Sequence, residues 1–221
     1  MISACVVVRN EAENLIRYFQ HVRRFCDEII VIIQESEDNT IRLCEKYADK
    51  VILSKNLGYN ELDRPYVCSL AKNNWVCTLD PDEQFENEFI EDLPAILEYC
   101  KEKNHDGVSC LIQNIYNGFE LQIKGLQQIR LAKKECSQST RIHTGWGCQN
   151  PLFLNYIQYH FKNYDDALSK EEWRNQHHDN NRIKANLIKY YANIKHALDV
   201  EKEKLKEVLD EIRNRGWGES N

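Results

Sequence analysis

The sequence predicts an α/β fold with a mostly parallel sheet, followed by a more irregular second half. Short apolar runs, typical of buried strands, alternate with amphipathic helical patterns through the first half of the chain. Each run ends in a polar turn, and one such turn, Asp80-Pro81-Asp82-Glu83, carries three carboxylates. Strand–helix–strand repeats of this kind form right-handed units whose neighbouring strands run parallel.

Three apolar runs predict strands. Residues 2–8 predict a strand covered on both faces, residues 28–33 a second buried strand, and residues 51–53 a third, short strand. A helical pattern that starts at Ala12 separates the first two runs. A second helix follows the polar segment 36–40, where Asp38 is a good N-cap. This order of elements is the basis for the predicted parallel sheet.

The central part of the sheet is expected around the acidic turn. A helix over residues 64–73 begins at a proline-containing start, and residues 75–79 form a short apolar strand that runs directly into the turn. Asn87 is expected to cap the following helix. Two further strands, at residues 107–115 and 128–132, complete the predicted sheet.

The C-terminal part has weaker patterns. The dipeptide Asn117-Gly118 predicts a hairpin, residues 155–161 alternate weakly, and residues 169–173 resemble a capped helix start. The segment 182–221 is expected to be a long helical extension of a domain that spans residues 1–181. This helix either packs on its own domain or contacts a partner, such as a larger enzyme or a second copy.

Composition and charge argue against several classes of protein. The net charge of −6 argues against a nucleic-acid binder, which would need a basic face. No apolar stretch has the length of a membrane span, and the N-terminal apolar run lacks the basic region of a signal peptide. The nine cysteines are odd in number, scattered and without Cys-x-x-Cys spacing. They predict buried reduced thiols and a cytoplasmic location rather than disulfides or a structural zinc site.

The acidic turn is the strongest functional signal. Three carboxylates that follow a strand repel one another, and a cation or a basic ligand would offset that repulsion. Ligands of open α/β sheets bind at the carboxyl ends of the strands. Carboxylate oxygens suit Mg²⁺ or Mn²⁺, which proteins bind through one or two carboxylates plus substrate phosphates.

Together these motifs resemble the family 2 inverting glycosyltransferases of the GT-A fold, a Rossmann-like, mostly parallel sheet flanked by helices. The residues that carry the resemblance lie, in order, at 6–11, 27–31, 36–40, 71–76 and 79–83. A looser similarity is His160 followed by the segment 169–173, which looks like the part that closes the site in small bacterial and viral members.

The resemblance implies a metal-bound nucleotide-sugar site in a glycosyltransferase domain (1–181) with a nucleotide-binding half (1–105) and an acceptor-side half (106–181). Asp82 would be the main ligand of Mn²⁺ or Mg²⁺, with Asp80 acting through a water, the ribose or the second shell, and His160 or His143 completing the metal shell. Arg64 would clamp phosphate, although a surface helix-start arginine is an equal alternative. The full set of implied nucleotide-sugar contacts is Val8, Arg9, Asn10, Glu11, Asp38, Arg64, Asp80, Pro81, Asp82 and Trp146.

Three departures from the family pattern affect base recognition and catalysis. Ile33 stands where an aspartate usually reads the uracil, and Glu35 stands where a glycine is usual. An inverting transfer needs a carboxylate base. Many relatives supply it from a late Glu-Asp pair, sometimes after Gly-Trp-Gly. Here the sequence 145–147 leads to Gln149 and Asn150, and amides are not bases. Glu83, Asp165 and Asp166 are the alternative base candidates.

The expected function is a metal-dependent inverting glycosyltransferase. It would move a hexose from a nucleoside-diphosphate sugar, with a UDP-sugar as the first expectation, to a glycan, glycolipid or glycoprotein. One alternative is a catalytically silent nucleotide-sugar-binding module, which the amide pair after Gly147 keeps open. The other is a sugar-1-phosphate nucleotidyltransferase. The glycine-free, acidic segment after the first strand disfavours this enzyme class, because it needs a glycine-rich basic loop there.

Overall fold

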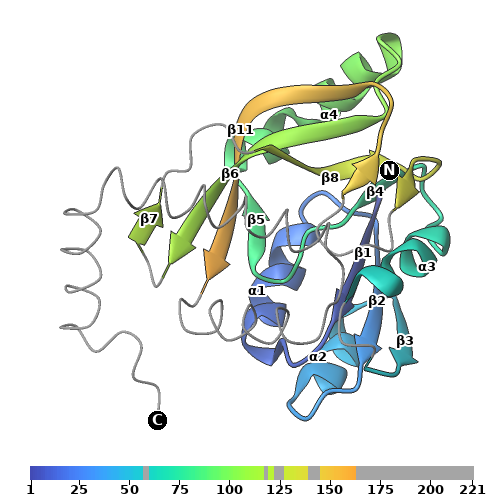
Figure 1. Ribbon diagram of the computed structural model, residues 1–221, viewed down its shortest axis with the longest axis vertical. Coiled ribbons are helices and arrows are strands. Elements are labelled where there is room, and N and C mark those ends of the chain that lie inside the picture. Colours follow the sequence, from blue (N-terminus) through green and yellow to red (C-terminus); the bar gives the residue numbers. More distant parts are fainter. Residues whose placement is uncertain (57–59, 117–118, 122–126, 139–144, 163–221) are drawn as a thin grey trace, which may run out of the picture. The chain divides into compact units, whose positions relative to one another are not determined.

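The computed structural model describes residues 1–56, 60–116, 119–121, 127–138 and 145–162 (Figure 1). The chain divides into two compact units. The first contains residues 1–112 and 126–159, and the second contains residues 113–125 and 160–221. The first unit holds the acidic turn and is the α/β body that the sequence predicts.

The first half of the chain follows the expected order. The elements are β1 (Ile2–Val8), α1 (Ala12–Val22), β2 (Glu28–Gln34), α2 (Thr40–Tyr47), β3 (Lys50–Ser54), a 3-10 turn (Asn60–Leu62), α3 (Arg64–Ser69), β4 (Trp75–Cys77), β5 (Glu83–Phe85) and α4 (Asn87–Glu102). Every residue of β1 and β2 is buried, as expected for strands covered on both faces.

The remaining described elements are strands. They are β6 (Gly107–Tyr116), β7 (Phe119–Leu121), β8 (Gln127–Lys133), β9 (Ser137–Gln138), β10 (Trp146–Gly147) and β11 (Pro151–Lys162). Antiparallel pairing of β6 with β7 confirms the hairpin predicted at residues 117–118. Short β9 and β10 form a separate antiparallel ribbon.

The main sheet is mixed. Its strand order is β3-β2-β1-β4-β8-β6-β11-β5, with β7 paired to β6. Strands β3, β2, β1 and β4 run parallel, and β8 pairs antiparallel with both β4 and β6. The parallel half is the predicted βαβ region, and its strands end at one common edge next to the acidic turn.

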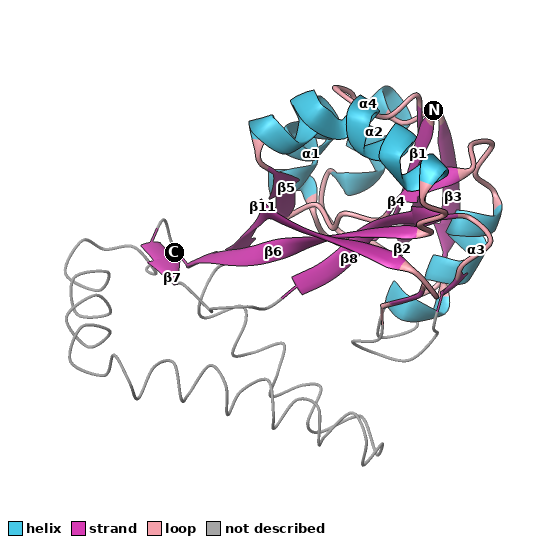
Figure 2. Cartoon of the chain, turned by 90° about the horizontal axis from the view of Figure 1, so that it is seen from above, coloured by secondary structure: helices cyan, strands magenta, loops and turns pink. Residues whose placement is uncertain are grey.

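Helices cover both faces of this sheet (Figure 2). Helices α1, α2 and α4 pack on one face, where the apolar stripe of α1 (Leu15, Tyr18, Phe19 and Val22) joins the larger core. Helix α3 packs on the other face through Val67 and Cys68. Strands β1 and β2 therefore have the two-sided burial that their apolar runs predict, whereas the edge strand β3 is partly exposed.

Several expected boundaries were wrong for identifiable reasons. Helix α3 stops at Ser69 rather than near residue 73, because the carboxylate of Glu28 accepts a hydrogen bond from the Lys72 amide (2.9 Å). The N-cap of α4 is Glu86, which is held extended by mutual hydrogen bonds with Ile157 of β11. The strand expected over 75–79 is shorter, since β4 ends at residue 77.

The predictions beyond residue 162 lie outside the described residues. These are the helix start at 169–173, the helical extension at 182–221, and the base candidates Asp165 and Asp166. Within the described ranges, no helix combines the length and apolar character needed to cross a membrane.

Candidate functional site

The carboxyl ends of the parallel strands carry a set of linked polar turns. The turn after β1 contains Asn10, whose φ of 52° is in the left-handed region that asparagine tolerates better than most residues. Its backbone N–H donates to Ser36 Oγ (3.1 Å) and its Oδ1 accepts from the Glu37 amide (2.8 Å). These bonds tie the turn after β1 to the turn after β2, so both turns form one edge.

The residues after β1 that the sequence assigned to nucleotide contact lie at this edge. Arg9 and Asn10 are exposed and Glu11 is partly exposed, whereas the Val8 side chain is fully buried. Val8 could contact a ligand only through its backbone. Arg9 Nε donates to the Glu35 carbonyl (3.3 Å), which holds the arginine across the edge.

Asp38 holds this edge together. Its two carboxylate oxygens accept hydrogen bonds from the backbone N–H groups of Ala12 and Thr40, both at 3.0 Å. Burial alone would raise the pKa of Asp38, but the bonds from Thr40 and Ala12 outweigh it and lower that pKa. Asn39, not Asp38, is the N-cap residue of α2. These contacts favour a structural role for Asp38 over base contact.

Two arginines from distant segments bind the acidic turn. Arg64 Nη2, at the start of α3, lies 2.6 Å from Asp80 Oδ1, and Arg130 Nη2, on β8, lies 2.8 Å from Asp80 Oδ2. The same Arg130 nitrogen also contacts the carboxylate of Glu83. Asp80 is therefore held between two guanidinium groups.

The turn also closes on itself. The Asp80 amide donates to Glu83 Oε2 (2.9 Å), and the Glu83 amide donates to the Asp80 carbonyl (2.9 Å). Between them, the buried Pro81 restricts the backbone, and Asp82 is partly exposed. The turn is rigid on the Asp80 and Glu83 side and presents Asp82 at its tip.

The ion pair beneath the turn is buried. Glu83 has no exposed surface, and Arg130 is 5% exposed. Burial alone would lower the pKa of Arg130, but the charges of Glu83, Asp80 and Asp82 together raise it above its usual range. Arg130 is thus a fixed cation. In this arrangement the Glu83 carboxylate has no access to solvent, which favours a positioning role for it over a role as base.

The sequence-based reasoning missed Arg130, although a signal was present. Arg130 interrupts an apolar strand pattern between Ile129 and Leu131. A buried arginine is rare unless a carboxylate is paired with it, so a lone arginine in a core strand predicts a buried acidic partner. The partner itself, Glu83, is 47 residues away in sequence.

Trp146 lies in β10 and is buried. Its indole Nε1 donates to Thr78 Oγ1 (3.1 Å), and its ring belongs to the core on the α3 face of the sheet. This favours a packing role over stacking on a sugar. Through Thr78, Trp146 supports the segment that leads to Asp80.

The amide pair after Gly147 is held at the foot of the ribbon. The backbone N–H groups of Gln149 and Asn150 donate to the Asp106 carboxylate at 2.6 and 2.9 Å. The Asn150 side chain donates to the carbonyls of Lys103 and Asn104 at the end of α4. Both residues therefore stabilise the strand junction, in keeping with their inability to act as bases.

The other predicted site residues have different outcomes. Ile33 is buried between β1 and β3, so it belongs to the core and contributes no base contact. His160 lies in β11, in the second unit, and is partly buried. Its role as a metal ligand stays a prediction. His143, Asp165 and Asp166 lie outside the described residues.

The donor set fits a hard divalent cation. Arginines engage Asp80 and Glu83, and Asp82 is the partly exposed carboxylate at the tip of the turn. Mg²⁺ and Mn²⁺ are commonly held by one or two carboxylates together with phosphate oxygens of a substrate. Asp82 would hold such an ion, with Asp80 behind it.

Comparison with known proteins identifies the family. The model of glycosyl transferase family 2 matches residues 3–158. An uncharacterized glycosyltransferase of Rickettsia conorii is 34% identical over 95 residues, which are 43% of this chain and 33% of the relative. A homologous protein of Rickettsia bellii is 32% identical over 95 residues, covering 43% of this chain and 32% of the relative. The chain thus spans about a third of the length of these relatives.

Solved structures show the same fold. The crystal structure of S. aureus TarS 1-349 superposes with a TM-score of 0.54 at 13% identity, covering 72% of this chain and 60% of that one. Its complex with UDP-GlcNAc superposes with a TM-score of 0.54 at 17% identity, covering 73% and 58%. At this identity the likeness shows the GT-A-like fold.

Proposed function

The chain belongs to glycosyltransferase family 2, and from this premise we propose that it is a metal-dependent inverting hexosyltransferase. Its donor is a nucleoside-diphosphate sugar, with a UDP-sugar as the first choice. Its acceptor is a hydroxyl group of a glycan, glycolipid or glycoprotein. The TarS complex with UDP-GlcNAc, which shares this fold, supports the choice of donor.

The observation that carries the proposal is the arrangement of the acidic turn. Two arginines neutralise Asp80 and Glu83 from behind, while Asp82 stands partly exposed at the edge where ligands of α/β sheets bind. A purely solvated turn would not need a buried arginine beneath it, because water alone would screen its charges. The turn is built to hold Asp82 in one position.

The chain's own residues supply binding and orientation. Asp82 would hold Mn²⁺ or Mg²⁺, which when bound offsets charge on the leaving diphosphate. Arg64 is 16% exposed, and its guanidinium has more N–H donors than its contact with Asp80 uses. It can therefore hold Asp80 and contact a donor phosphate. Asn10 and Glu11 flank the ribose and base at the end of β1.

Nucleobase recognition must differ from the common family pattern, since Ile33 is in the core. Glu35 is exposed at the same edge, and its carboxylate accepts from the Asn56 amide (3.3 Å). We propose that the polar side chains of Glu35 and Asn10, both exposed at this edge, contact the nucleobase. All nine cysteines are free thiols, which suits the cytoplasm as the proposed location.

Calorimetric titration tests the donor site. The metal-free protein is titrated with UDP, with and without Mn²⁺, and the Asp82→Asn variant is compared with Asp92→Asn. Asp92 is an exposed carboxylate on α4 that accepts from the Tyr156 hydroxyl, and asparagine keeps that acceptor. We expect Mn²⁺-dependent binding in the wild type and the control, with a loss of at least about tenfold in Asp82→Asn.

Two results would overturn the proposal. Binding of no nucleoside diphosphate from a panel of bases, with Mn²⁺ present, would reduce the acidic turn to a structural turn. Equal Mn²⁺-dependent affinity in Asp82→Asn would remove Asp82 from the site. The same samples, given UDP-sugars, measure donor hydrolysis and transfer.

A second candidate is a nucleotide-sugar-binding module without transfer activity. The specific observation in its favour is the loss of two base positions. Glu83 is sequestered by Arg130, and the amides Gln149 and Asn150 stand where relatives place a carboxylate. Nucleotide binding combined with no hydrolysis or transfer for any donor would select this module.

A further inference from the structure

A second polar cluster, separate from the acidic turn, lies at the end of the β9–β10 ribbon that is formed by Ser137 and Gly147. Trp146 pairs with Gln138 and Gly147 pairs with Ser137 in antiparallel register. The next pair in the same register is Cys148 opposite Cys136, each one residue beyond the strands. Antiparallel partners have Cβ atoms about 5 Å apart, so the two thiols face each other across the ribbon.

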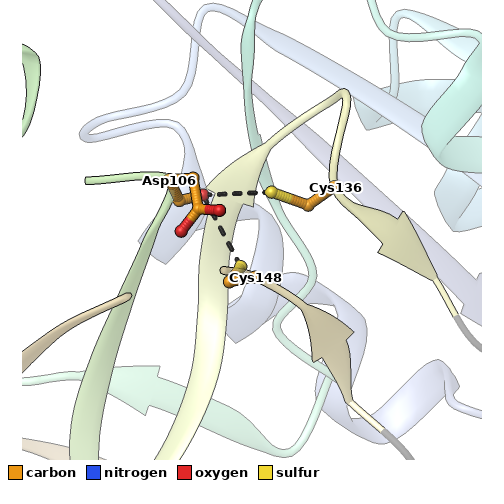
Figure 3. Close-up of side chains that lie close together, drawn as sticks. All are labelled: Asp106, Cys136 and Cys148. Atoms are coloured by element: carbon orange, nitrogen blue, oxygen red, sulfur yellow. Dashed lines mark hydrogen bonds between the residues drawn. The ribbon is translucent and has the colours of Figure 1, made fainter. Parts of the chain in front are cut away.

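Asp106 completes the cluster. One oxygen of its carboxylate and the two sulfurs all lie within 4.8 Å of one another, and all three residues are partly buried. Figure 3 shows both sulfurs directed toward Asp106. Both thiols donate to its backbone carbonyl, at 3.4 Å from Cys136 and 3.6 Å from Cys148. Three groups from separate segments thus converge on one point.

The spacing suits a tetrahedral metal. Zinc binds thiolate sulfur at about 2.3 Å and carboxylate oxygen at about 2.0–2.2 Å, so two sulfurs on one zinc ion lie about 3.8 Å apart. The observed upper limit of 4.8 Å leaves little adjustment to reach that separation. Thiolates with one carboxylate favour zinc over Mg²⁺ or Mn²⁺, which prefer an all-oxygen set.

The carboxylate is already oriented. Its two oxygens accept from the Gln149 and Asn150 amides (2.6 and 2.9 Å), so Asp106 cannot rotate freely. Groups that fix a ligand in this way are typical of metal sites. Gly107 makes room for the sulfur, because a Cβ at this position would lie 2.5 Å from Cys148 Sγ.

We propose that Cys136, Cys148 and Asp106 form a zinc site, with the fourth position left to water. The ion would join the two strands of the ribbon to the start of β6, and so fix the ribbon that carries Trp146, which donates to Thr78. This site is separate from the Asp82 site and does not depend on the proposed transfer reaction. The Cys-x-x-Cys criterion misses it, because the ligands meet across a ribbon rather than along one segment.

The metal-free thiols are not reactive nucleophiles. Burial is the largest cause that raises the pKa of both thiols, and the charge of Asp106 adds to it. Both groups are therefore protonated at neutral pH, and a bound cation would displace the two protons.

Cobalt is the spectroscopic probe. The reduced, chelator-treated full chain is titrated with Co²⁺ and then with Zn²⁺, in the Asp82→Asn background so that the acidic turn does not compete. We expect one equivalent of Co²⁺ with thiolate charge-transfer absorption in the near ultraviolet, displaced by Zn²⁺. Histidines elsewhere in the chain can bind either metal, but they give no such absorption.

The variants identify the ligands. Cys136→Ser and Cys148→Ser should each weaken Zn²⁺ binding by at least about 100-fold, and Asp106→Asn by about 10–100-fold. Gly107→Ala removes no ligand but displaces the Cys148 sulfur, so it should also weaken binding. Cys100→Ala removes a buried thiol from α4 and is the matched control, with unchanged absorption and affinity.

Three results would overturn the site. The first is no charge-transfer absorption in the reduced protein. The second is unchanged Zn²⁺ affinity in the Cys136→Ser/Cys148→Ser double variant. The third is a chain that binds no metal but loses two hydrogens in mass on exchange with oxidised glutathione, in a reaction that the double variant lacks. That outcome would make the pair a disulfide formed by thiol–disulfide exchange, with glutathione as the reduced product.

Discussion

Replacing Arg130 by methionine should lower the free energy of unfolding by about 3–5 kcal/mol, the usual cost of removing one member of a buried ion pair. Arg130 is 5% exposed and Glu83 is fully buried, so water cannot replace the lost contact. Methionine fills much of the space of the arginine stem, and the loss therefore reports the charge rather than a cavity.

The size of the effect depends on what Glu83 retains. After the substitution it still accepts from the Asp80 amide (2.9 Å), but its charge has lost the Arg130 partner. Glu83→Gln leaves Arg130 bound to Asp80 and keeps an acceptor for that amide. It should cost less, about 1–3 kcal/mol.

A double-mutant cycle isolates the pair. If Arg130 and Glu83 stabilise the turn through each other, the double variant should lose less than the sum of the single variants. The difference should be about 1–3 kcal/mol, within the range seen for residues in one network. Additive losses would mean that each residue acts alone.

Urea unfolding, followed by tryptophan fluorescence, measures these differences. The control is Arg23→Met, which removes an arginine from an exposed pair with Asp49 (2.8 Å; side chains 38% and 44% exposed). Exposed pairs contribute about 0–1 kcal/mol. A loss for Arg130→Met that matches this control, or additive behaviour in the cycle, would refute the reasoning about the buried pair.

Two further predictions concern pH and catalysis. Burial lowers the pKa of His21 to about 4 from an ordinary value of 6.5, and its Nε2 accepts from the Phe85 amide (3.0 Å). As the pH falls, His21 is protonated in the unfolded chain before it is protonated in the folded one. The free energy of unfolding should therefore fall by up to about 3 kcal/mol as the pH drops from 6.5 through 4. His21→Gln, which keeps an acceptor, should flatten that part of the urea-unfolding profile, and an unchanged profile would contradict the assignment. If Asp165 or Asp166 is the catalytic base, replacing that residue by asparagine should lower kcat by about 10²–10⁴-fold while donor binding stays intact. A wild-type kcat in each of the two variants would exclude both residues as the base.

The parallel half of the fold could be predicted because its signal is local. Strands β1 and β2 are buried on both faces, so each reads as one uninterrupted apolar run. The stripe of α1 has a clear helical period for the same reason. Burial of whole elements leaves a pattern in neighbouring residues, which is why these boundaries were close to the observed ones.

The short strands gave no comparable signal. Strand β5 has three residues and is stabilised by its place beside β11, about seventy residues later, as the bonds between Glu86 and Ile157 show. The β9–β10 ribbon likewise depends on pairing across residues 139–144. Propensity in three residues is too weak to reveal such pairing, so the position of the Cys136–Cys148 pair could not be predicted either.

The acidic turn shows what the sequence-based argument captured and what it lacked. It expected a cation or a basic ligand to offset the three carboxylates, and it took Mg²⁺ or Mn²⁺ as that cation. Among the described residues, the chain itself supplies cations at Arg64 and Arg130, which lie 16 and 50 residues from Asp80. In the proposed site, a divalent cation held by Asp82 would add to these fixed positive charges, and the turn would then attract a diphosphate.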